Sequence, residues 1–382
     1  MIFADDLRRY SERHLTSPEK VVKPMRIVSV GTAYPPHRYP QSEITEALKG
    51  RMKDRPGIPA AMERLHANCG VDFRNIMFPL DTLGSLSGFG PTNDAWIEGA
   101  LDLGQKAVQS ALDRAGLTPS DISAIFFTSV TGIACPSIDA RLVNLMGFPA
   151  TVKRTPIFGL GCVAGAAGIS RATDYVRAYP KQYALLLAVE LCSLTWQDQD
   201  QSMANLVASG LFGDGAAAVV LAGEETALAQ KPTSVQDPCP RVVSTRSTMY
   251  PDTEHLMGWK INETGFNIVL SAEVPDLVTN ELRGTVEGFL DDNDLTMGQI
   301  CSFIFHSGGP KVLKAMEASL DLPRGALSAS WNSLRQRGNL SSASVLTVME
   351  DFLMNRPGSP GCYSMIGAMG PAFCSELLLL QW

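Results

Sequence analysis

The sequence predicts a layered α/β fold built from two similar halves, and three observations lead to this prediction. Hydrophobic residues make up 45% of the 382 residues and charged residues only 19%, the balance of a chain that buries a large core. Apolar, β-branched runs alternate with segments of helical spacing. A pattern of residues also repeats without a gap at an offset of 178. We therefore expect a duplicated pair of halves.

The first half is expected over residues 25–230, after an N-terminal extension at 1–24. The extension carries charged side chains at positions 5, 6, 8, 9, 12 and 13 and no apolar core, so we do not expect a secretory signal. Within this half the predicted strands are 25–30, 122–128, 155–158, 183–190 and 216–221, and the predicted helices are 94–116, 139–146 and 162–177.

The second half is expected over residues 231–382. A polar segment with prolines, 223–240, is typical of a link between the two halves. Strand and helix patterns then resume. The predicted strands lie near 242–248, 266–271, 301–306, 362–367 and 373–380, and the predicted helices near 276–290, 309–320 and 340–355.

The repeat relates two pairs of segments. Residues 117–129 match 295–307, and at nearly the same offset 161–168 correspond to 338–344. Both members of the second pair begin with glycine and continue in small residues. Two helices whose first turns lack bulk are expected to pack closely in the centre of the protein.

Several classes of function are excluded by composition. The net charge is −7, the pI is near 5.3 and there is no basic run, so no nucleic-acid partner is expected. No uninterrupted run of 18 apolar residues predicts a transmembrane segment, and we expect a cytoplasmic protein. Eight cysteines without a CxxC pair and five histidines predict neither disulfides nor a metal site, since His66 and Cys69 are the one close pair.

Three residues are the candidates for chemistry. The repeat places Cys162 and Asn339 at the starts of equivalent helices, and His306 at the end of a strand beside a turn at Gly308. A cysteine in the first turn of a helix feels the positive end of the helix dipole, and a nearby imidazole would further favour its thiolate. The pattern therefore predicts a nucleophilic cysteine.

Each of these residues also has a purely structural interpretation. A lone cysteine commonly packs as a small hydrophobic residue, a histidine on an apolar strand can be part of the core, and asparagine is a preferred helix cap. The pairing of all three across the repeat favours catalysis by Cys162, His306 and Asn339.

Five motifs extend this hypothesis to a family. They are GCVAGAAG (161–168), LFGDGAAAVVL (211–221), FHSGGP (305–310), GNLSSAS (338–344) and GPAF (370–373). In this order they resemble the chalcone synthase-like type III polyketide synthases of the thiolase superfamily. The resemblance runs from about residue 28 to 382. It implies a thiolase-like five-layered αβαβα fold, a homodimer, and a catalytic triad formed by Cys162, His306 and Asn339.

The resemblance also implies the chemistry. Cys162 would accept an acyl group from an acyl-CoA starter, with an acyl carrier protein as an alternative donor. Malonyl-CoA would then lose carbon dioxide, and His306 and Asn339 would stabilise the enolate. No cofactor is expected beyond the two substrates, acyl-CoA and malonyl-CoA.

Further positions correspond to the family's substrate pocket. Phe212 matches a gatekeeper, Thr195 a pocket-lining threonine, Cys135 the residue that reaches into the partner's cavity, and Arg64 a contact to the CoA phosphates. Gly308 and Met369 lie in the two glycine-containing turns near the triad. The sequence departs from the family at Ile268, where a second aromatic gatekeeper is expected, at Ala61 and Asn68, where basic CoA contacts are expected, and at Ala372, which replaces a glycine.

The product was predicted from a narrower resemblance. The segments 251–259, 264–266 and 270–275, with the ending FCSELLLLQW, are similar to the bacterial enzymes that make long-chain alkylpyrones and alkylresorcinols. We expect an alkylpyrone made from a fatty acyl-CoA. The alternatives are an alkylresorcinol synthase, a single-round ketoacyl synthase, a Cys-His thioesterase and a non-enzymatic acyl-chain binder.

One helix carries a further prediction about this product. Gly284 and Gly288 lie on one face of the helix expected at 276–290, where each glycine costs about 1 kcal/mol relative to alanine. Two glycines on one face of a helix indicate that another group approaches the helix backbone closely there. The approaching group is either another helix or the acyl chain, and we expect Gly284 to border the cavity.

Overall fold

The structure is a computed structural model that describes residues 25–382, apart from 83–84, 87, 232–238 and 356–357. The N-terminal extension predicted at 1–24 lies outside the described residues. Residues 232–238 of the link predicted at 223–240 also lie outside the described residues. No helix in the described part of the chain is both long and apolar enough to cross a membrane.

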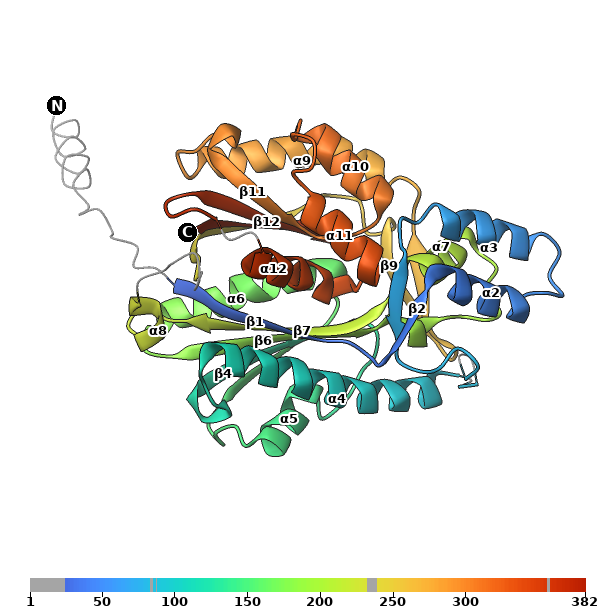
Figure 1. Ribbon diagram of the computed structural model, residues 1–382, viewed down its shortest axis with the longest axis horizontal. Coiled ribbons are helices and arrows are strands. Elements are labelled where there is room, and N and C mark those ends of the chain that lie inside the picture. Colours follow the sequence, from blue (N-terminus) through green and yellow to red (C-terminus); the bar gives the residue numbers. More distant parts are fainter. Residues whose placement is uncertain (1–24, 83–84, 87, 232–238, 356–357) are drawn as a thin grey trace, which may run out of the picture.

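The described residues form five layers, which confirms the predicted αβαβα order (Figure 1). Helices α9 and α10 cover one outer face, and α4 and α5 cover the other. Helices α6 and α12 lie between two layers of strands, with α11 beside α12. The bounds of these helices are α4 Phe89–Ala115, α5 Ile138–Met146, α6 Ala164–Ala178, α9 Val274–Asp291, α10 Pro310–Ser319, α11 Ser328–Arg337 and α12 Ser344–Asn355.

Nine of the described strands join in one sheet with the order β11-β12-β13-β8-β1-β7-β6-β4-β5. The two layers of strands meet where β1 pairs with β8, a seam of two residue pairs, Met25 with Val242 and Arg26 with Arg241. The strands are β1 Met25–Ala33, β4 Ile122–Thr128, β5 Lys153–Ile157, β6 Tyr183–Leu191, β7 Asp214–Ala222, β8 Arg241–Met249, β11 Ile300–Phe305, β12 Tyr363–Gly370 and β13 Cys374–Gln381.

The duplication predicted from the sequence is present in the fold. In each half a threonine caps a short 3₁₀ turn that leads into a strand with a parallel neighbour. The Thr118 backbone N–H donates to Asp121 Oδ2 over 2.8 Å, and the Thr296 N–H donates to Gln299 Oε1 over 2.8 Å. Strands β4 and β11 follow these turns. The two halves therefore repeat the same local structure.

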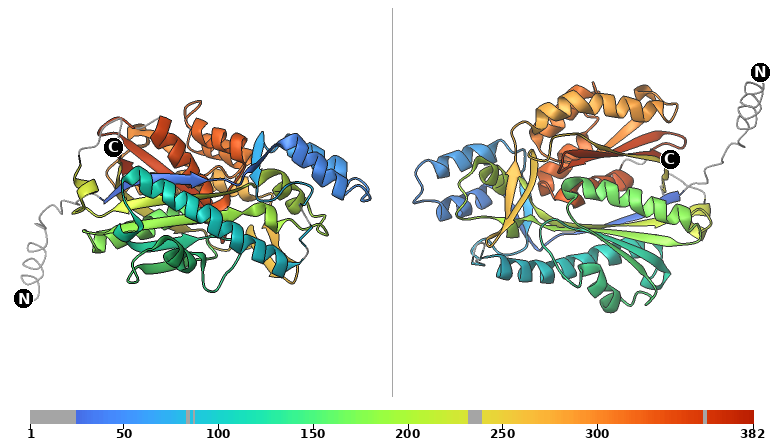
Figure 2. Two further views of the ribbon diagram at one scale, coloured as in Figure 1. Left: turned by 60° about the horizontal axis from the view of Figure 1, so that its bottom comes forward. Right: turned by 180° about the vertical axis from the view of Figure 1, so that it is seen from behind.

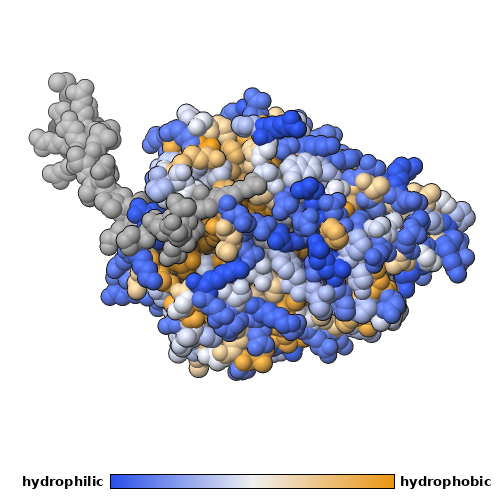
Figure 3. Space-filling view, viewed as in Figure 1, coloured by the Kyte–Doolittle hydropathy of each residue, from blue (hydrophilic) through white to orange (hydrophobic). Residues whose placement is uncertain are grey.

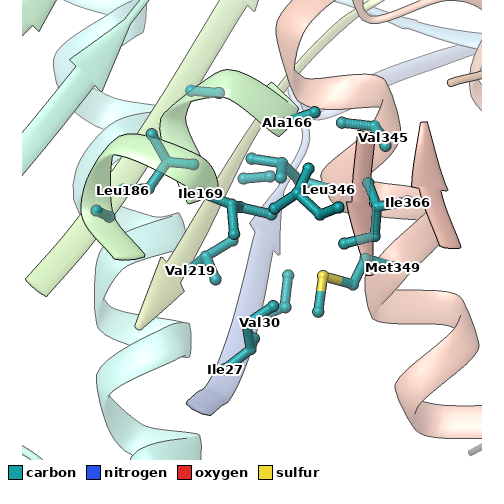
Figure 4. Packing of buried hydrophobic residues seen from close by; sticks show 14 of the residues in the cluster. Ile27, Val30, Ala166, Ile169, Leu186, Val219, Val345, Leu346, Met349 and Ile366 are labelled. Atoms are coloured by element: carbon teal, nitrogen blue, oxygen red, sulfur yellow. The ribbon is translucent and has the colours of Figure 1, made fainter. Parts of the chain in front are cut away.

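The two central helices approach as closely as the small-residue pattern predicts. A Cβ atom added at Gly165 in α6 would lie 2.2 Å from the backbone oxygen of Ser342, in the turn that precedes α12. Glycine is therefore required at this crossing. Further along the helices, Ile169 and Leu346 meet between the two layers of strands (Figure 4).

Strands β6 and β7 are buried along almost their whole length because helices cover both of their faces. This explains why their sequences are continuous apolar runs rather than alternating ones. Helix α4 begins at Phe89, five residues before the start predicted from its spacing. Pro91 falls in the first turn, where the missing N–H of a proline is tolerated.

One end of the layers carries elements that the sequence patterns did not predict. Helices α2, α3 and α7 gather there with a β-hairpin, as both views in Figure 2 show. Predicted strand 266–271 is the second strand of this hairpin rather than part of the large sheet. The bounds are β2 His37–Pro40, α2 Gln41–Arg51, α3 Ile58–Ala67, β3 Phe73–Ile76, α7 Met203–Leu211, β9 Met257–Asn262 and β10 Gly265–Leu270. The short helix α8, Ala227–Gln230, lies at the opposite end, next to β1 (Figure 1).

Candidate functional site

Cys162 lies in a 3₁₀ turn, Gly161–Val163, directly before α6. Gly161 has φ +56°, and a Cβ atom there would lie 2.5 Å from the ring of Pro371. Glycine therefore allows the turn that presents the cysteine. The Cys162 side chain is 8% exposed, and its Sγ lies 3.5 Å from Ser341 Oγ. The thiol is at a helix start, buried but still reachable.

His306 directly follows β11, as predicted. Its backbone N–H donates to the Gly367 carbonyl over 2.9 Å, which fixes the residue at the end of the strand. The side chain is 3% exposed, and its Nδ1 has no hydrogen-bond partner among the described residues. The ring packs beside Gly308, where an added Cβ would lie 3.3 Å from His306 Cδ2.

Asn339 uses the two ends of its amide differently. Its Oδ1 accepts from the Ser341 N–H over 2.8 Å and from Ser344 Oγ over 3.2 Å, which is the capping role foreseen as an alternative. Its Nδ2 donates to the Gly308 carbonyl over 3.1 Å. A side-chain amide has two N–H donors, so one more remains for a ligand.

The backbone of the LFGDG motif (211–215) pairs with the backbone of Asn339, and this places Phe212 at the site. The Asn339 N–H donates to the Leu211 carbonyl over 2.8 Å, and the Gly213 N–H donates back to the Asn339 carbonyl over 3.0 Å. An added Cβ at Gly213 would lie 2.3 Å from a backbone oxygen of Arg337. The glycine is needed for this crossing.

Cys162, His306 and Asn339 line one cavity of about 490 Å³. Its walls also include Gly308 and Met369, both predicted site residues. Most other lining residues are apolar and come from the end of the molecule that holds α3, α7 and the β9–β10 hairpin. The structure thus brings the predicted triad together beside a space large enough for a small-molecule substrate.

Burial acts in opposite directions on the two titratable members of the triad. It raises the pKa of the Cys162 thiol to about 12 and lowers the pKa of the His306 imidazole to about 4. Loss of water therefore disfavours the charged form of each group taken alone. The hydrogen bond with Ser341 Oγ and the nearby Asn339 amide favour the thiolate.

Glu190 lies near Cys162 and was not singled out from the sequence. Its carboxylate is fully buried and accepts hydrogen bonds from Ser342 Oγ, from Thr131 Oγ1 over 2.9 Å, and from Ser129 Oγ and the Val130 N–H over 3.2 Å each. Burial raises its pKa to about 7. A charged residue ending the apolar run at 183–190 was the signal that could have found it.

A second, smaller cavity of about 40 Å³ lies beyond Phe212. Four residues line both cavities and so form the wall between them: Cys192, Phe212, Trp259 and Ile268. Thr195, predicted as a pocket residue, lines the smaller cavity. The two predicted gatekeeper positions, Phe212 and Ile268, thus lie between the spaces.

Three predicted site residues are not in either cavity. Arg64 is exposed on α3, although Leu65 and Asn68 beside it line the larger cavity. Cys135 is exposed before β5. Gly284 is exposed on α9, with no atom within 4 Å of an added Cβ, so the structure does not support the prediction that it borders the cavity.

Lys311 is a cation that the sequence reasoning missed. It lines the larger cavity from the start of α10 and is itself exposed, so it lies where the cavity opens to water. Its place two residues after Gly309 in FHSGGP was the available signal. Among the described residues, no group of three or more His, Cys, Asp or Glu side chains could hold a metal ion.

Comparison with known proteins gives a consistent result. The family model for the N-terminal domain of chalcone and stilbene synthases matches residues 17–225, and the model for their C-terminal domain matches 241–380. A 1,3,6,8-tetrahydroxynaphthalene synthase from Streptomyces peucetius subsp. caesius is 48% identical over 356 residues, covering 93% of each chain. A phloroglucinol synthase from Pseudomonas fluorescens is 31% identical and covers 91% of this chain and 97% of its own.

A solved structure shows the same fold. The 1,3,6,8-tetrahydroxynaphthalene synthase of Streptomyces coelicolor A3(2), described as a bacterial type III polyketide synthase, superposes with a TM-score of 0.86. The two sequences are 31% identical, and the match covers 94% of this chain and 99% of the other.

Proposed function

This chain belongs to the chalcone and stilbene synthase family and is a type III polyketide synthase, an acyltransferase, and we propose that it condenses malonyl-CoA repeatedly on Cys162 and closes the chain to a hydroxylated aromatic product. The observation that carries the proposal is the meeting of Cys162, His306 and Asn339 in one cavity.

The first step is acyl transfer to Cys162. The imidazole of His306 takes the proton of the thiol on Nε2 as Sγ attacks the thioester carbonyl, and the CoA sulfur departs as a thiolate that takes its proton from water. Transfer within the buried pair creates the thiolate only while the imidazolium is beside it. This explains how a thiol whose pKa is raised by burial can still act as a nucleophile.

The second step makes the carbon nucleophile. Malonyl-CoA loses carbon dioxide, and negative charge develops on its thioester oxygen. His306 Nε2–H and the free N–H of Asn339 Nδ2 can donate to that oxygen, and removing one such donor typically costs about 3 kcal/mol. The carbanion attacks the Cys162 thioester, and Sγ leaves. The lengthened chain is then a CoA thioester, and it returns to Cys162 by the first step before the next condensation. This sequence requires no cofactor beyond the thioesters.

The relatives support an aromatic product. Two tetrahydroxynaphthalene synthases and a phloroglucinol synthase are among them. In 1,3,6,8-tetrahydroxynaphthalene the oxygens stand on alternating ring carbons, as iterative condensation of two-carbon units would place them. Its skeleton carries no side chain, so a starter that leaves an alkyl tail is not needed for a product of this type.

A long-chain alkylpyrone remains the second candidate. It is favoured by the larger cavity, which is mostly apolar and, at about 490 Å³, has the size of sites for drug-sized ligands. The fatty acyl tail of an extended chain on Cys162 could lie there, and an enol oxygen in the extended part could attack the thioester carbonyl, releasing Sγ and closing the lactone. An alkylresorcinol would need a different, carbon–carbon closure of the same chain.

One experiment separates these products. The protein is incubated with radiolabelled malonyl-CoA, alone and with lauroyl-CoA, and products are identified by mass spectrometry. Labelled hydroxynaphthalenes from malonyl-CoA alone support the first candidate, and labelled alkylpyrones only with lauroyl-CoA support the second. Hydrolysis of acyl-CoA without use of malonyl-CoA would indicate a thioesterase and contradict both.

We also propose that the protein is a homodimer. The apolar side chains of Ile133, Leu145 and Phe158 are exposed in the segment 129–158, which runs from the end of β4 to just after β5 and includes Cys135. Figure 3 shows a largely hydrophilic face with an apolar patch at its lower edge, where α5 lies. Light scattering should give twice the 41.1 kDa chain mass, and Ile133→Glu should lower it.

CoA is proposed to bind with its phosphates near Lys311, which lines the larger cavity and is exposed, and near Arg64, which is exposed on α3 next to the lining residue Leu65. Replacing Lys311 with Gln should raise KM for malonyl-CoA while leaving kcat nearly unchanged, since this contact is made equally before and during reaction. An unchanged KM would assign the phosphates to other residues.

A further inference from the structure

The smaller cavity contains a buried guanidinium with an unused donor. Arg74 is the second residue of β3, is 3% exposed and lines this cavity. Its Nε donates to Gln41 Oε1 over 3.0 Å and its Nη1 donates to the Phe212 carbonyl over 2.6 Å. Its Nη2 is buried and has no hydrogen-bond partner among the described residues.

This guanidinium also lacks a direct counter-ion. Arg74 takes part in none of the ion pairs formed by the described residues. Asp214, a carboxylate that raises the pKa of Arg74, already accepts from the Ser193 N–H over 2.8 Å and the Met77 N–H over 2.7 Å. Burial lowers the pKa of Arg74 to about 10, so it is still charged at neutral pH. A buried cation without an ion-pair partner is costly, which is a reason to expect an anionic ligand.

The other polar side chains around the smaller cavity are already satisfied. Thr195 Oγ1 donates to the Cys192 carbonyl, Ser209 Oγ bonds to His66 Nε2, and Asn205 Nδ2 donates to two backbone carbonyls. The remaining lining residues are mainly apolar. A ligand that enters would therefore meet one free, positively charged donor, that of Arg74, in a cavity whose other lining residues are mainly apolar or already hydrogen-bonded.

The size and place of this cavity limit what can enter it. About 40 Å³ is room for about three water molecules, enough for a carboxylate or a carbonyl group but not for a long alkyl chain. The wall toward Cys162 consists of side chains, including Phe212 and Ile268, which can change rotamer on binding.

We propose that Arg74 and the smaller cavity form a subsite for the far end of the chain held on Cys162, and that this subsite takes an anionic oxygen, either a carboxylate or the enolate of an extended chain. Arg74 is then a specificity-determining residue. The inference rests on the proposed polyketide synthase function, because the chain it binds is the one attached to Cys162.

The test compares matched thioesters in competition. Glutaryl-CoA and valeryl-CoA have acyl groups of the same length that end in a carboxylate or a methyl group. A second pair, 3,5-dioxohexanoyl and hexanoyl thioesters of N-acetylcysteamine, differs by ketone oxygens. Brief incubation with each pair is followed by intact-protein mass spectrometry, which gives the ratio of the two adducts on Cys162.

Wild type should favour the oxygen-bearing member of at least one pair. In Arg74→Met that ratio should fall by about tenfold or more, since hydrogen bonds to charged groups contribute in this range. The pair affected tells whether a carboxylate or a chain enolate is the natural ligand. The matched control is Arg283→Met, an exposed arginine on α9 whose ion pair with Glu287 is on the surface.

Arg74→Met also removes the hydrogen bond to the Phe212 carbonyl, so a second variant tests the cavity without removing that bond. Ala208→Leu fills the smaller cavity without removing a hydrogen bond of Arg74, and its ratio should fall as well. A fall in Arg74→Met alone, or unchanged ratios in a folded Arg74→Met protein, would overturn the subsite. Equal loading of both members of each pair by wild type would also overturn it. If no thioester acylates wild-type Cys162, the proposed function itself fails.

Discussion

Replacing Glu190 by Gln should make the protein more stable at neutral pH without changing its stability at pH 4.5. Glutamine has nearly the shape of a protonated glutamate. Its oxygen can keep accepting from the Val130 N–H and Thr131, and its amide can donate to Ser342 Oγ, which turns from donor to acceptor. The variant therefore removes a titration and leaves the network in place.

The magnitude follows from the pKa of Glu190. Burial raises it from 4.5 to about 7 in the folded protein. Below pH 4.5 the carboxyl is protonated in both states and costs nothing. As the pH rises from 4.5 to 7, the unfolded chain gives up this proton while the folded protein keeps it, so stability is lost progressively. The loss is about 3 kcal/mol and is constant above pH 7.

Urea denaturation followed by tryptophan fluorescence, at the same protein concentration across pH 4.5–8, measures the effect. The difference in free energy of unfolding between Glu190→Gln and wild type should grow from near zero to about 3 kcal/mol over this range. Glu281→Gln, an exposed position on α9, is the control and should show no such growth. A difference that stays constant with pH would mean that Glu190 is ionised in the fold at all these pH values and would refute the reasoning.

Three further outcomes are expected. Cys162→Ala should leave the fold intact and abolish acylation, so an acyl adduct in its intact-protein mass spectrum would contradict the assignment of the nucleophile. Asn339→Ala should still be acylated but should decarboxylate malonyl-CoA roughly a hundredfold more slowly, whereas equal loss of both steps would indicate that the amide serves mainly as a cap. Gly165→Ala should destabilise the protein by about 3 kcal/mol, because its Cβ would lie 2.2 Å from the Ser342 carbonyl. The control Gly284→Ala has open space around it and should be neutral or stabilising by up to about 1 kcal/mol. Similar melting temperatures for both variants would refute the close crossing of the central helices.

The sequence predicted the layers well because their strands and helices are buried on faces that leave a clear pattern. β6 and β7 are covered on both sides and read as continuous apolar runs, and the repeat placed Cys162 and Asn339 at equivalent helix starts. The three residues that meet in the larger cavity, Cys162, His306 and Asn339, could therefore be singled out from one chain alone.

The end of the molecule that forms the cavity walls could not be predicted in the same way. The helices and strands at this end are short, and half of the β9 residues are exposed. Short elements of this kind leave no regular spacing of apolar residues in the sequence. Arg74 was missed because its partners, Gln41 and the Phe212 carbonyl, are far away in the sequence. Gly284 misled for a related reason, because a glycine stripe does not reveal which side of a helix faces the core. In α9 the buried residues Val278, Leu282 and Val286 lie on the other side.

The seam between β1 and β8 has a consequence for how the protein folds during synthesis. All strands on one side of the seam come from residues 25–222 and all described strands on the other side from 241–381, so each side can pair its strands without the other. The amino-terminal half leaves the ribosome first, and until α12 arrives it exposes the small-residue surface of α6 and the open edge of β1. We expect this nascent half to be the stage most prone to aggregation, which pulse proteolysis of ribosome-bound chains ending near residue 225 would detect.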